Sequence, residues 1–109
     1  QLLANPEAIH LRQEQVDRRK AWVAEVSGEL AAFAVLDGGE IDGLFVDPPR
    51  WRMGIGSALV DVVAHEARRR GLSLTVTAAP ESREFYERCG FIVEDEAETR
   101  FGPALRMSR

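Results

Sequence analysis

The stretch 44–71 constrains the fold of this chain more than any other. It overlaps a short apolar run at 41–46, continues through a turn broken by Pro48 and Pro49, and contains glycines at 54 and 56. From 54 to 70 apolar side chains recur at helical spacing, at positions 55, 59, 62, 63 and 67, and Gly71 is a typical helix stop. The sequence therefore predicts a buried strand, a glycine loop and a long helix in direct succession.

Such a junction is suited to binding an anion. The first turn of a helix leaves its backbone N–H groups without internal partners, and these groups lie at the positive end of the helix dipole. A phosphate set against residues 53–57 would satisfy these donors, and Gly54 and Gly56 leave room for its approach. We therefore expect a phosphate-bearing ligand at this loop.

Two common phosphate-binding loops fit poorly. A Walker loop ends in Gly-Lys-Ser/Thr, whereas Gly56 is followed by Ser57 and Ala58. A dinucleotide-binding fingerprint needs a third glycine near position 59 and an acidic residue about twenty residues later, whereas this chain has Leu59 and then Leu-Thr-Val at 74–76.

Two blocks of the chain together carry a resemblance. The first is Leu-Phe-Val-Asp-Pro at 44–48 followed by Met-Gly-Ile-Gly-Ser-Ala-Leu at 53–59, and the second is Phe-Tyr-Glu-Arg-Cys-Gly-Phe at 85–91. In this order they resemble the GCN5-related N-acetyltransferase (GNAT) superfamily, whose signature is Gln/Arg-x-x-Gly-x-Gly/Ala. The Gln/Arg position of that signature falls on Trp51, between Arg50 and Arg52.

The resemblance implies an α/β (α+β) fold with a mixed, mostly antiparallel sheet around a central parallel βαβ unit. The family's N-terminal strand and first helix are apparently lacking here. We expect a single domain with a helical acceptor-side segment at 1–20, antiparallel strands at 21–47, the acetyl-CoA-binding strand, loop, helix and strand at 48–79, and a helix with closing strands at 80–109. Within it, the strands are predicted at 21–26, 30–36, 40–46, 72–78, 91–93 and 104–107, and the second helix at 80–89.

The resemblance also implies how acetyl-CoA is held. The loop would bind the pyrophosphate, the pantetheine arm would lie against the strand before it, and the amide of Phe45 would meet the thioester carbonyl. The implied coenzyme-binding residues are Leu44, Phe45, Val46, Arg52, Met53, Gly54, Ile55, Gly56 and Ser57, with Ser82 and Arg83 one turn before the second block's tyrosine.

Three side chains are candidates for proton transfer. An acceptor ammonium, with a pKa near about 10.4 if it is lysine-like, must lose a proton before it attacks, and a nearby carboxylate can take that proton. Glu40 ranks first and Asp42 second, since both are expected on one face of the strand that leads into the loop. The alternative is that both are exposed strand acids and water accepts the proton. Tyr86 occupies the place of the family's acid, which protonates the departing thiolate.

Composition narrows the function further. The single cysteine, Cys89, excludes an internal disulfide, and with only two histidines no zinc-binding spacing exists. A formal net charge of −4 argues against nucleic-acid binding and favours cationic partners such as amines. No apolar run approaches the roughly 18 residues of a membrane span. We expect a cytoplasmic protein, with a homodimer reasonable through edge strands at its C-terminus.

These observations favour an acetyl-CoA-dependent N-acetyltransferase. It would transfer an acetyl group directly to a primary amine, with a small molecule favoured over a protein as acceptor and with no metal. The alternative is a catalytically weak acyl-CoA-binding or regulatory module that keeps the loop but not the chemistry.

Overall fold

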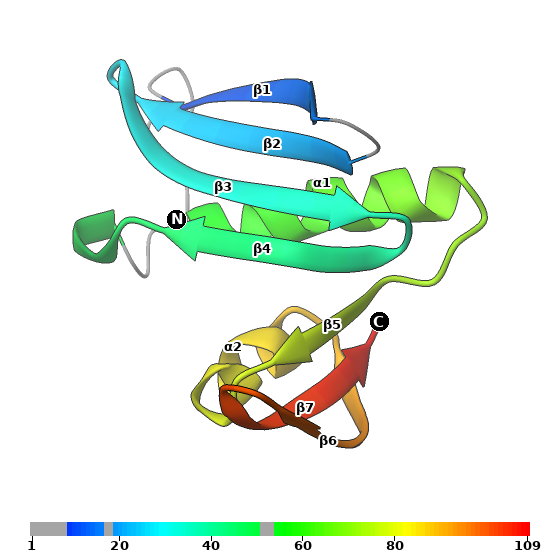
Figure 1. The fold of residues 1–109 in the computed structure, drawn as a ribbon. Coiled ribbons are helices and arrows are strands. Elements are labelled where there is room, and N and C mark those ends of the chain that lie inside the picture. Colours follow the sequence, from blue (N-terminus) through cyan, green and yellow to red (C-terminus); the bar gives the residue numbers. More distant parts are fainter. Residues whose placement is uncertain (1–8, 17–18, 51–53) are drawn as a thin grey trace.

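The computed structural model describes residues 9–16, 19–50 and 54–109 (Figure 1). Within this part of the chain, from β2 onward, the strands and helices follow one another in the order that the sequence predicts. The elements are β1 (Ile9–Val16), β2 (Arg19–Val26), β3 (Glu29–Asp37), β4 (Glu40–Val46), α1 (Ile55–Arg69), β5 (Thr75–Ala78), α2 (Arg83–Arg88), β6 (Ile92–Thr99) and β7 (Gly102–Ser108), with short 3₁₀ turns at Pro48–Arg50 and Pro80–Ser82.

The described strands form one mixed sheet in the order β1-β2-β3-β4-β5-β7-β6. Every neighbouring pair is antiparallel except β4 and β5, which are parallel and are joined by α1. A parallel pair requires a crossover of this kind. The predicted fold class, a mostly antiparallel sheet around one parallel βαβ unit, is confirmed.

The helical prediction for 1–20 is wrong where the structure describes that segment. Residues 9–16 form strand β1, which pairs with β2 along its whole length, from Ile9 opposite Val26 to Val16 opposite Arg19. The residues Asn5-Pro6-Glu7, whose sequence is typical of a helix start, lie outside the described residues. Pairing with the open edge of β2 outweighs weak local helix preference, and Arg12 adds an ion pair to Glu25 across the strands, at 3.0 Å.

Other boundaries moved by a few residues. Strand β5 begins at Thr75 rather than at 72, and the predicted helix at 80–89 divides into a 3₁₀ turn and the short α2. The closing strand predicted at 91–93 is longer in the structure, because the edge strand β6 includes the acidic run 94–98. Neither described helix is both long and apolar enough to cross a membrane.

The core lies between the sheet and the two helices, on one face only. Alternate residues of β2 and β3 face α1, and several are alanines, which let the helix approach closely. From α1 the buried residues include Leu59, Val60 and Val63, each contributing about 1.5–3 kcal/mol on burial. Trp22 of β2 is also buried there. Figure 1 shows α1 behind β3 and β4.

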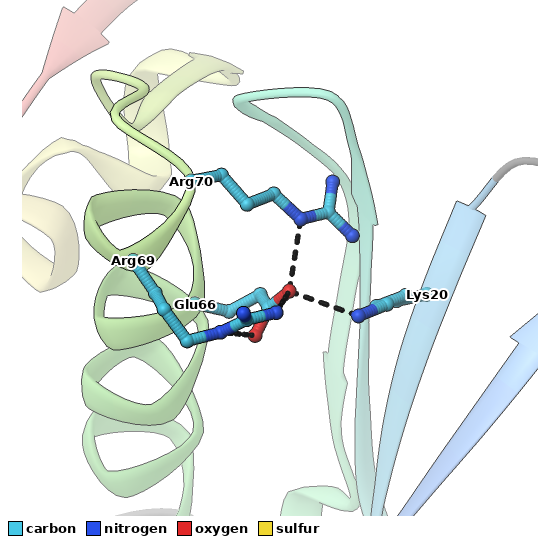
Figure 2. A network of polar contacts seen from close by, with 4 residues as sticks. All are labelled: Lys20, Glu66, Arg69 and Arg70. Atoms are coloured by element: carbon cyan, nitrogen blue, oxygen red, sulfur yellow. Dashed lines mark hydrogen bonds and ion pairs between the residues drawn. The ribbon is translucent and has the colours of Figure 1, made fainter.

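A charged cluster fixes the C-terminal end of α1 to the sheet (Figure 2). One carboxylate oxygen of Glu66 accepts hydrogen bonds from Lys20 Nζ at 2.9 Å, Arg69 Nη2 at 2.8 Å and Arg70 Nε at 2.8 Å, and the other accepts one from Arg69 Nε at 3.1 Å. Hydrogen bonds from Arg69 and Lys20 lower the pKa of Glu66 to about 2, against the opposing effect of burial. Since Lys20 belongs to β2, the cluster ties the helix to the sheet.

Candidate functional site

The N-terminus of α1 is open to an anion. Gly54 caps it with φ 80° and ψ 5°, a left-handed conformation suited to glycine, without a side-chain cap or an acidic residue in the first turn. The first hydrogen bond of the helix runs from the Ala58 N–H to the Gly54 carbonyl at 3.0 Å. Among the described residues, no backbone carbonyl accepts from the amides at 54–57 outside the helix itself. These donors are therefore available to a ligand.

Gly56 serves packing as well as access. A Cβ atom built on it would lie 3.1 Å from Cγ2 of Val46 and 3.2 Å from Cζ of Phe85. The first turn of α1 can therefore approach the end of β4 and the side of α2 this closely only without a side chain at 56. From the sequence, Gly56 was expected to leave room for a ligand. Its close packing against Val46 and Phe85 is visible only in the structure.

The other loop residues differ in what they can offer. Ile55 is buried in the core, so only its backbone can face a ligand, and Ser57 is half-buried with its hydroxyl near enough to the Cys89 thiol to affect the pKa of that thiol. The predicted phosphate-loop residues Arg52 and Met53 lie outside the described residues, as does Trp51.

A gap opens between the two parallel strands toward this loop. Only Glu40 and Ile41 of β4 pair with β5, opposite Thr75 and Val76, although β4 continues to Val46. Figure 1 shows the two strands diverging from this point. The carboxyl ends of parallel strands are where ligands bind in such sheets, here directly before the N-terminus of α1.

The register of β4 shows which backbone groups face the gap. Asp42 is an extra residue opposite the step from Val35 to Leu36, which makes a β-bulge. Beyond it, the Asp47 N–H donates to the Ala31 carbonyl at 2.8 Å. Because backbone direction alternates along an antiparallel ladder, Phe45 also directs its N–H toward β3.

The expectation that the Phe45 amide meets a thioester is therefore wrong. The backbone groups of Leu44 and Val46 point toward the gap instead. The sequence alone could not show which amides of β4 point toward the gap, because their direction depends on the bulge and on pairing with β3. The Phe45 side chain stacks on Phe33, with ring centroids 5.6 Å apart.

Tyr86 combines a buried ring with an unbonded hydroxyl. Its ring packs edge-on against Phe85 and Phe91, at centroid distances of 5.1 and 5.3 Å. Burial, with a smaller effect of Cys89, raises the pKa of Tyr86 to about 12. Its hydroxyl makes no hydrogen bond to the described residues. In the same part of the chain, every fully buried side-chain N or O atom has a hydrogen-bond partner, so the Tyr86 hydroxyl is not fully buried. The hydroxyl oxygen therefore meets solvent and holds its proton at neutral pH.

The two candidate bases have different surroundings. Glu40 is exposed and accepts a hydrogen bond of 3.4 Å from the Thr77 hydroxyl, across the junction of β4 and β5. Asp42 is paired with Arg19, at 2.8 Å between Oδ2 and Nη1. Asp42 therefore already has a cationic partner, whereas the Glu40 carboxylate can be approached by a second cation, which favours Glu40 as the group that meets the acceptor.

The remaining candidates lie at the start of α2. Ser82 is half-buried and makes no capping hydrogen bond. Arg83 is exposed and paired with Glu87 one turn later, at 2.9 Å. Cys89, which follows α2, is buried, and burial raises the pKa of its thiol despite the Ser57 hydrogen bond. A raised pKa lowers the fraction of reactive thiolate, which argues against Cys89 as a nucleophile.

Sequence reasoning missed two hollows on the face of the sheet that α1 leaves uncovered. One contains Glu40, Thr75 and Thr77, and the other contains Thr77 and Phe101. The alternation of Thr75 and Thr77 with buried Val76, together with an aromatic residue in a tight turn, was the available signal. Within the described ranges, no group of three or more His, Cys, Asp or Glu side chains could hold a metal ion.

Known proteins share both the sequence pattern and the fold. The model of the acetyltransferase (GNAT) family matches residues 3–91. The uncharacterized N-acetyltransferase YafP of Escherichia coli K12 is 32% identical over 79 residues, which are 72% of this chain and 50% of YafP. This chain thus spans about half the length of that relative.

Solved structures of acetyltransferases have a similar fold. A GCN5-related N-acetyltransferase from Rhodopseudomonas palustris superimposes with a TM-score of 0.75 at 27% identity, covering 84% of this chain and 61% of that one. An aminoglycoside 6′-N-acetyltransferase solved with coenzyme A gives a TM-score of 0.74 at 20% identity, over 85% of this chain and 73% of that one, a likeness of fold. Since the family model covers more than half of its residues, this chain belongs to the acetyltransferase (GNAT) family.

Proposed function

We propose that this chain is an acetyl-CoA-dependent N-acetyltransferase that transfers an acetyl group directly to a primary amine of a small molecule. The observation that carries the proposal is the set of amides at 54–57, which are open to a ligand and lie where β4 and β5 diverge. The relatives YafP and the Rhodopseudomonas protein bear the name N-acetyltransferase, which supports the same activity.

The coenzyme would be bound mainly by backbone. Its diphosphate would accept hydrogen bonds from the amides at 54–57, with Arg52 and Met53 completing the loop. The pantetheine arm would pair with backbone groups of Leu44 and Val46 in the gap, as an added strand does. Ser82 and Arg83, at the start of α2, would contact the pantetheine and the phosphates. Arg83 would then exchange its present partner Glu87 for a phosphate.

The acceptor must reach the thioester as a free amine. Glu40 would take its proton, directly or through one water, and Asp42 is the second candidate because Arg19 already neutralises it. The amine nitrogen would then form a bond to the acetyl carbon. The negative oxygen that forms on the acetyl group would accept a hydrogen bond from the N–H of Leu44, which faces the gap.

The attack gives a tetrahedral intermediate, and its collapse breaks the carbon–sulfur bond and releases the thiolate of coenzyme A. Tyr86 would protonate it, since the pKa of about 12 keeps the hydroxyl protonated at any working pH and the oxygen meets solvent. The amine nitrogen would lose its second proton as the intermediate collapses, and this proton would restore the Tyr86 hydroxyl through water. The products are coenzyme A and an N-acetylated amine, and the proton taken by Glu40 returns to water.

Thiol release from acetyl-CoA in the presence of an amine panel tests the proposal. We expect amine-dependent release, and we expect Tyr86→Phe to lower turnover about 100-fold while acetyl-CoA affinity changes little, because the ring packing is retained. Calorimetry measures that affinity. Unchanged turnover would remove Tyr86 from the mechanism, and binding of acetyl-CoA without release of thiol for any amine would favour the binding module instead.

A further inference from the structure

One hollow on the uncovered face of the sheet is mostly apolar. It measures about 470 Å³, within the range of about 300–1,000 Å³ typical of small-molecule sites. Apolar side chains and methyl groups make most of its lining, which includes Thr77, Ala79, Phe101, Pro103 and Ala104. It is large enough for one aromatic ring with a short side chain.

Side-chain hydrogen bonds fix the backbone turn that carries Phe101 at the rim of this hollow. Its side chain is 89% exposed, more than that of any other large apolar residue in the described chain. The Thr99 hydroxyl accepts a hydrogen bond from the Phe101 N–H at 3.1 Å and donates one to the Gly102 carbonyl at 2.8 Å, which closes the turn. The Arg100 guanidinium lies 5.3 Å from the ring centroid. An exposed ring of this size beside an apolar hollow offers a contact surface to an apolar group bound there.

The second hollow shares Thr77 with the first and is more polar, because charged side chains form part of its lining. It measures about 350 Å³ and includes Glu40, Asp95 and Arg106. Asp95 and Arg106 pair with each other at 3.2 Å, whereas within the described residues Glu40 accepts only the weak hydrogen bond from the Thr77 hydroxyl. A cation entering here would therefore meet the Glu40 carboxylate.

Strand register brings the apolar hollow to the transfer site. Ala78 at the end of β5 pairs with Leu105, near the start of β7, so the turn that carries Phe101 lies at the carboxyl end of β5. The gap between β4 and β5 opens at the same end. One groove thus runs along the outer face of β5, with a carboxylate in its polar part and an aromatic ring in its apolar part.

We propose, resting on the proposed function, that this groove selects acceptors which carry an apolar or aromatic group on a primary amine, as a single-ring arylalkylamine does. The ammonium lies toward Glu40 and the ring packs between Phe101 and Ala104. Phe101 is a specificity-determining residue that leaves the transfer chemistry unchanged.

The experiment compares phenethylamine with ethanolamine as acceptors in the thiol-release assay. We expect kcat/KM to be at least about tenfold higher for phenethylamine, since burial of one ring gains this much. Phe101→Ala should remove about this factor by raising KM for phenethylamine, with kcat, the rate with ethanolamine and acetyl-CoA affinity unchanged. Ile92→Ala is the matched control, because Ile92 is also an exposed apolar residue and lies at the end of β6 that is far from the turn carrying Phe101.

Equal kcat/KM for the two amines, or equal effects of the two substitutions, would overturn the proposal. If no amine supports thiol release, the proposed function fails, and the groove is then tested by direct titration of the protein with phenethylamine. Saturable binding that is lost in Phe101→Ala and kept in Ile92→Ala would still support the groove. Absence of such binding would overturn it separately.

Discussion

Glu66 and Tyr86 are both buried side chains with displaced pKa values, and the causes differ. Three cations surround the Glu66 carboxylate and lower its pKa to about 2, so this charge stabilises the fold. Burial is the main cause that raises the pKa of Tyr86 to about 12. The Tyr86 hydroxyl makes no hydrogen bond to the described residues. A proton donor with no competing partner is available for chemistry, whereas a saturated carboxylate is not.

The Glu66 cluster predicts an acid-dependent stability. Because the folded-state pKa lies below the ordinary value of 4.5, the cluster stabilises the protein fully above about pH 4.5, and this contribution is lost as pH falls toward about 2. Glu66→Gln should lower the free energy of unfolding by about 2 kcal/mol at pH 7 and flatten its pH dependence between these values. Urea unfolding at several pH values measures both.

Glu87→Gln is the control for that substitution. Glu87 also pairs with an arginine one turn away, but both side chains are exposed, so the change should stay within about 0.5 kcal/mol. Equal losses for Glu66→Gln and Glu87→Gln would show that the cluster contributes no more than a surface ion pair.

At the scale of elements, α1 is fixed at both ends. Its C-terminal end is tied to β2 through Lys20 and Glu66, and its first turn packs on Val46 of β4 and Phe85 of α2 through the bare backbone of Gly56. The position of the open amides therefore depends on contacts along the whole helix. Rigid placement of this kind reduces the ordering cost of binding a ligand.

Gly56→Ala tests the N-terminal contact. An added Cβ would stand 3.1–3.3 Å from Val46 and Phe85, tighter than ordinary contact. The resulting strain should outweigh the gain of about 0.5–1 kcal/mol from the better helix former and leave a net loss of about 1 kcal/mol. Urea midpoints measure it, and calorimetry should show weaker acetyl-CoA binding. In a Phe85→Leu background the loss should shrink, and a Gly56→Ala protein as stable as the parent would refute the contact.

The elements that the sequence predicted correctly are those with local signals. Gly54, the apolar stripe of α1 and Gly71 define the helix without reference to any other strand, and the βαβ unit follows from it. Residues 9–16 carry no such signal and become β1 only because β2 offers an edge. The bulge at Asp42, and with it the direction of the Phe45 amide, depends on pairing with β3 and has no signature in the chain itself.

At the scale of the whole molecule, the two faces of the sheet differ. One face packs the core under α1 and α2, and the other bears the groove along β5. In our proposals the coenzyme enters at the N-terminus of α1 and the acceptor enters from the face opposite the helices, so the two meet where β4 and β5 part. The groove could not be predicted from sequence, because Glu40, Thr77 and Phe101 are brought together by three strand pairings.

The central claim is that the amides at 54–57 bind the diphosphate of acetyl-CoA, and backbone NMR during a titration with acetyl-CoA tests it most directly. We expect the ¹H–¹⁵N signals of Gly54, Ile55, Gly56 and Ser57 to shift downfield and to saturate together, while those of Arg68 and Arg69 at the far end of α1 stay in place. Saturable acetyl-CoA binding with the 54–57 signals unmoved would contradict the account.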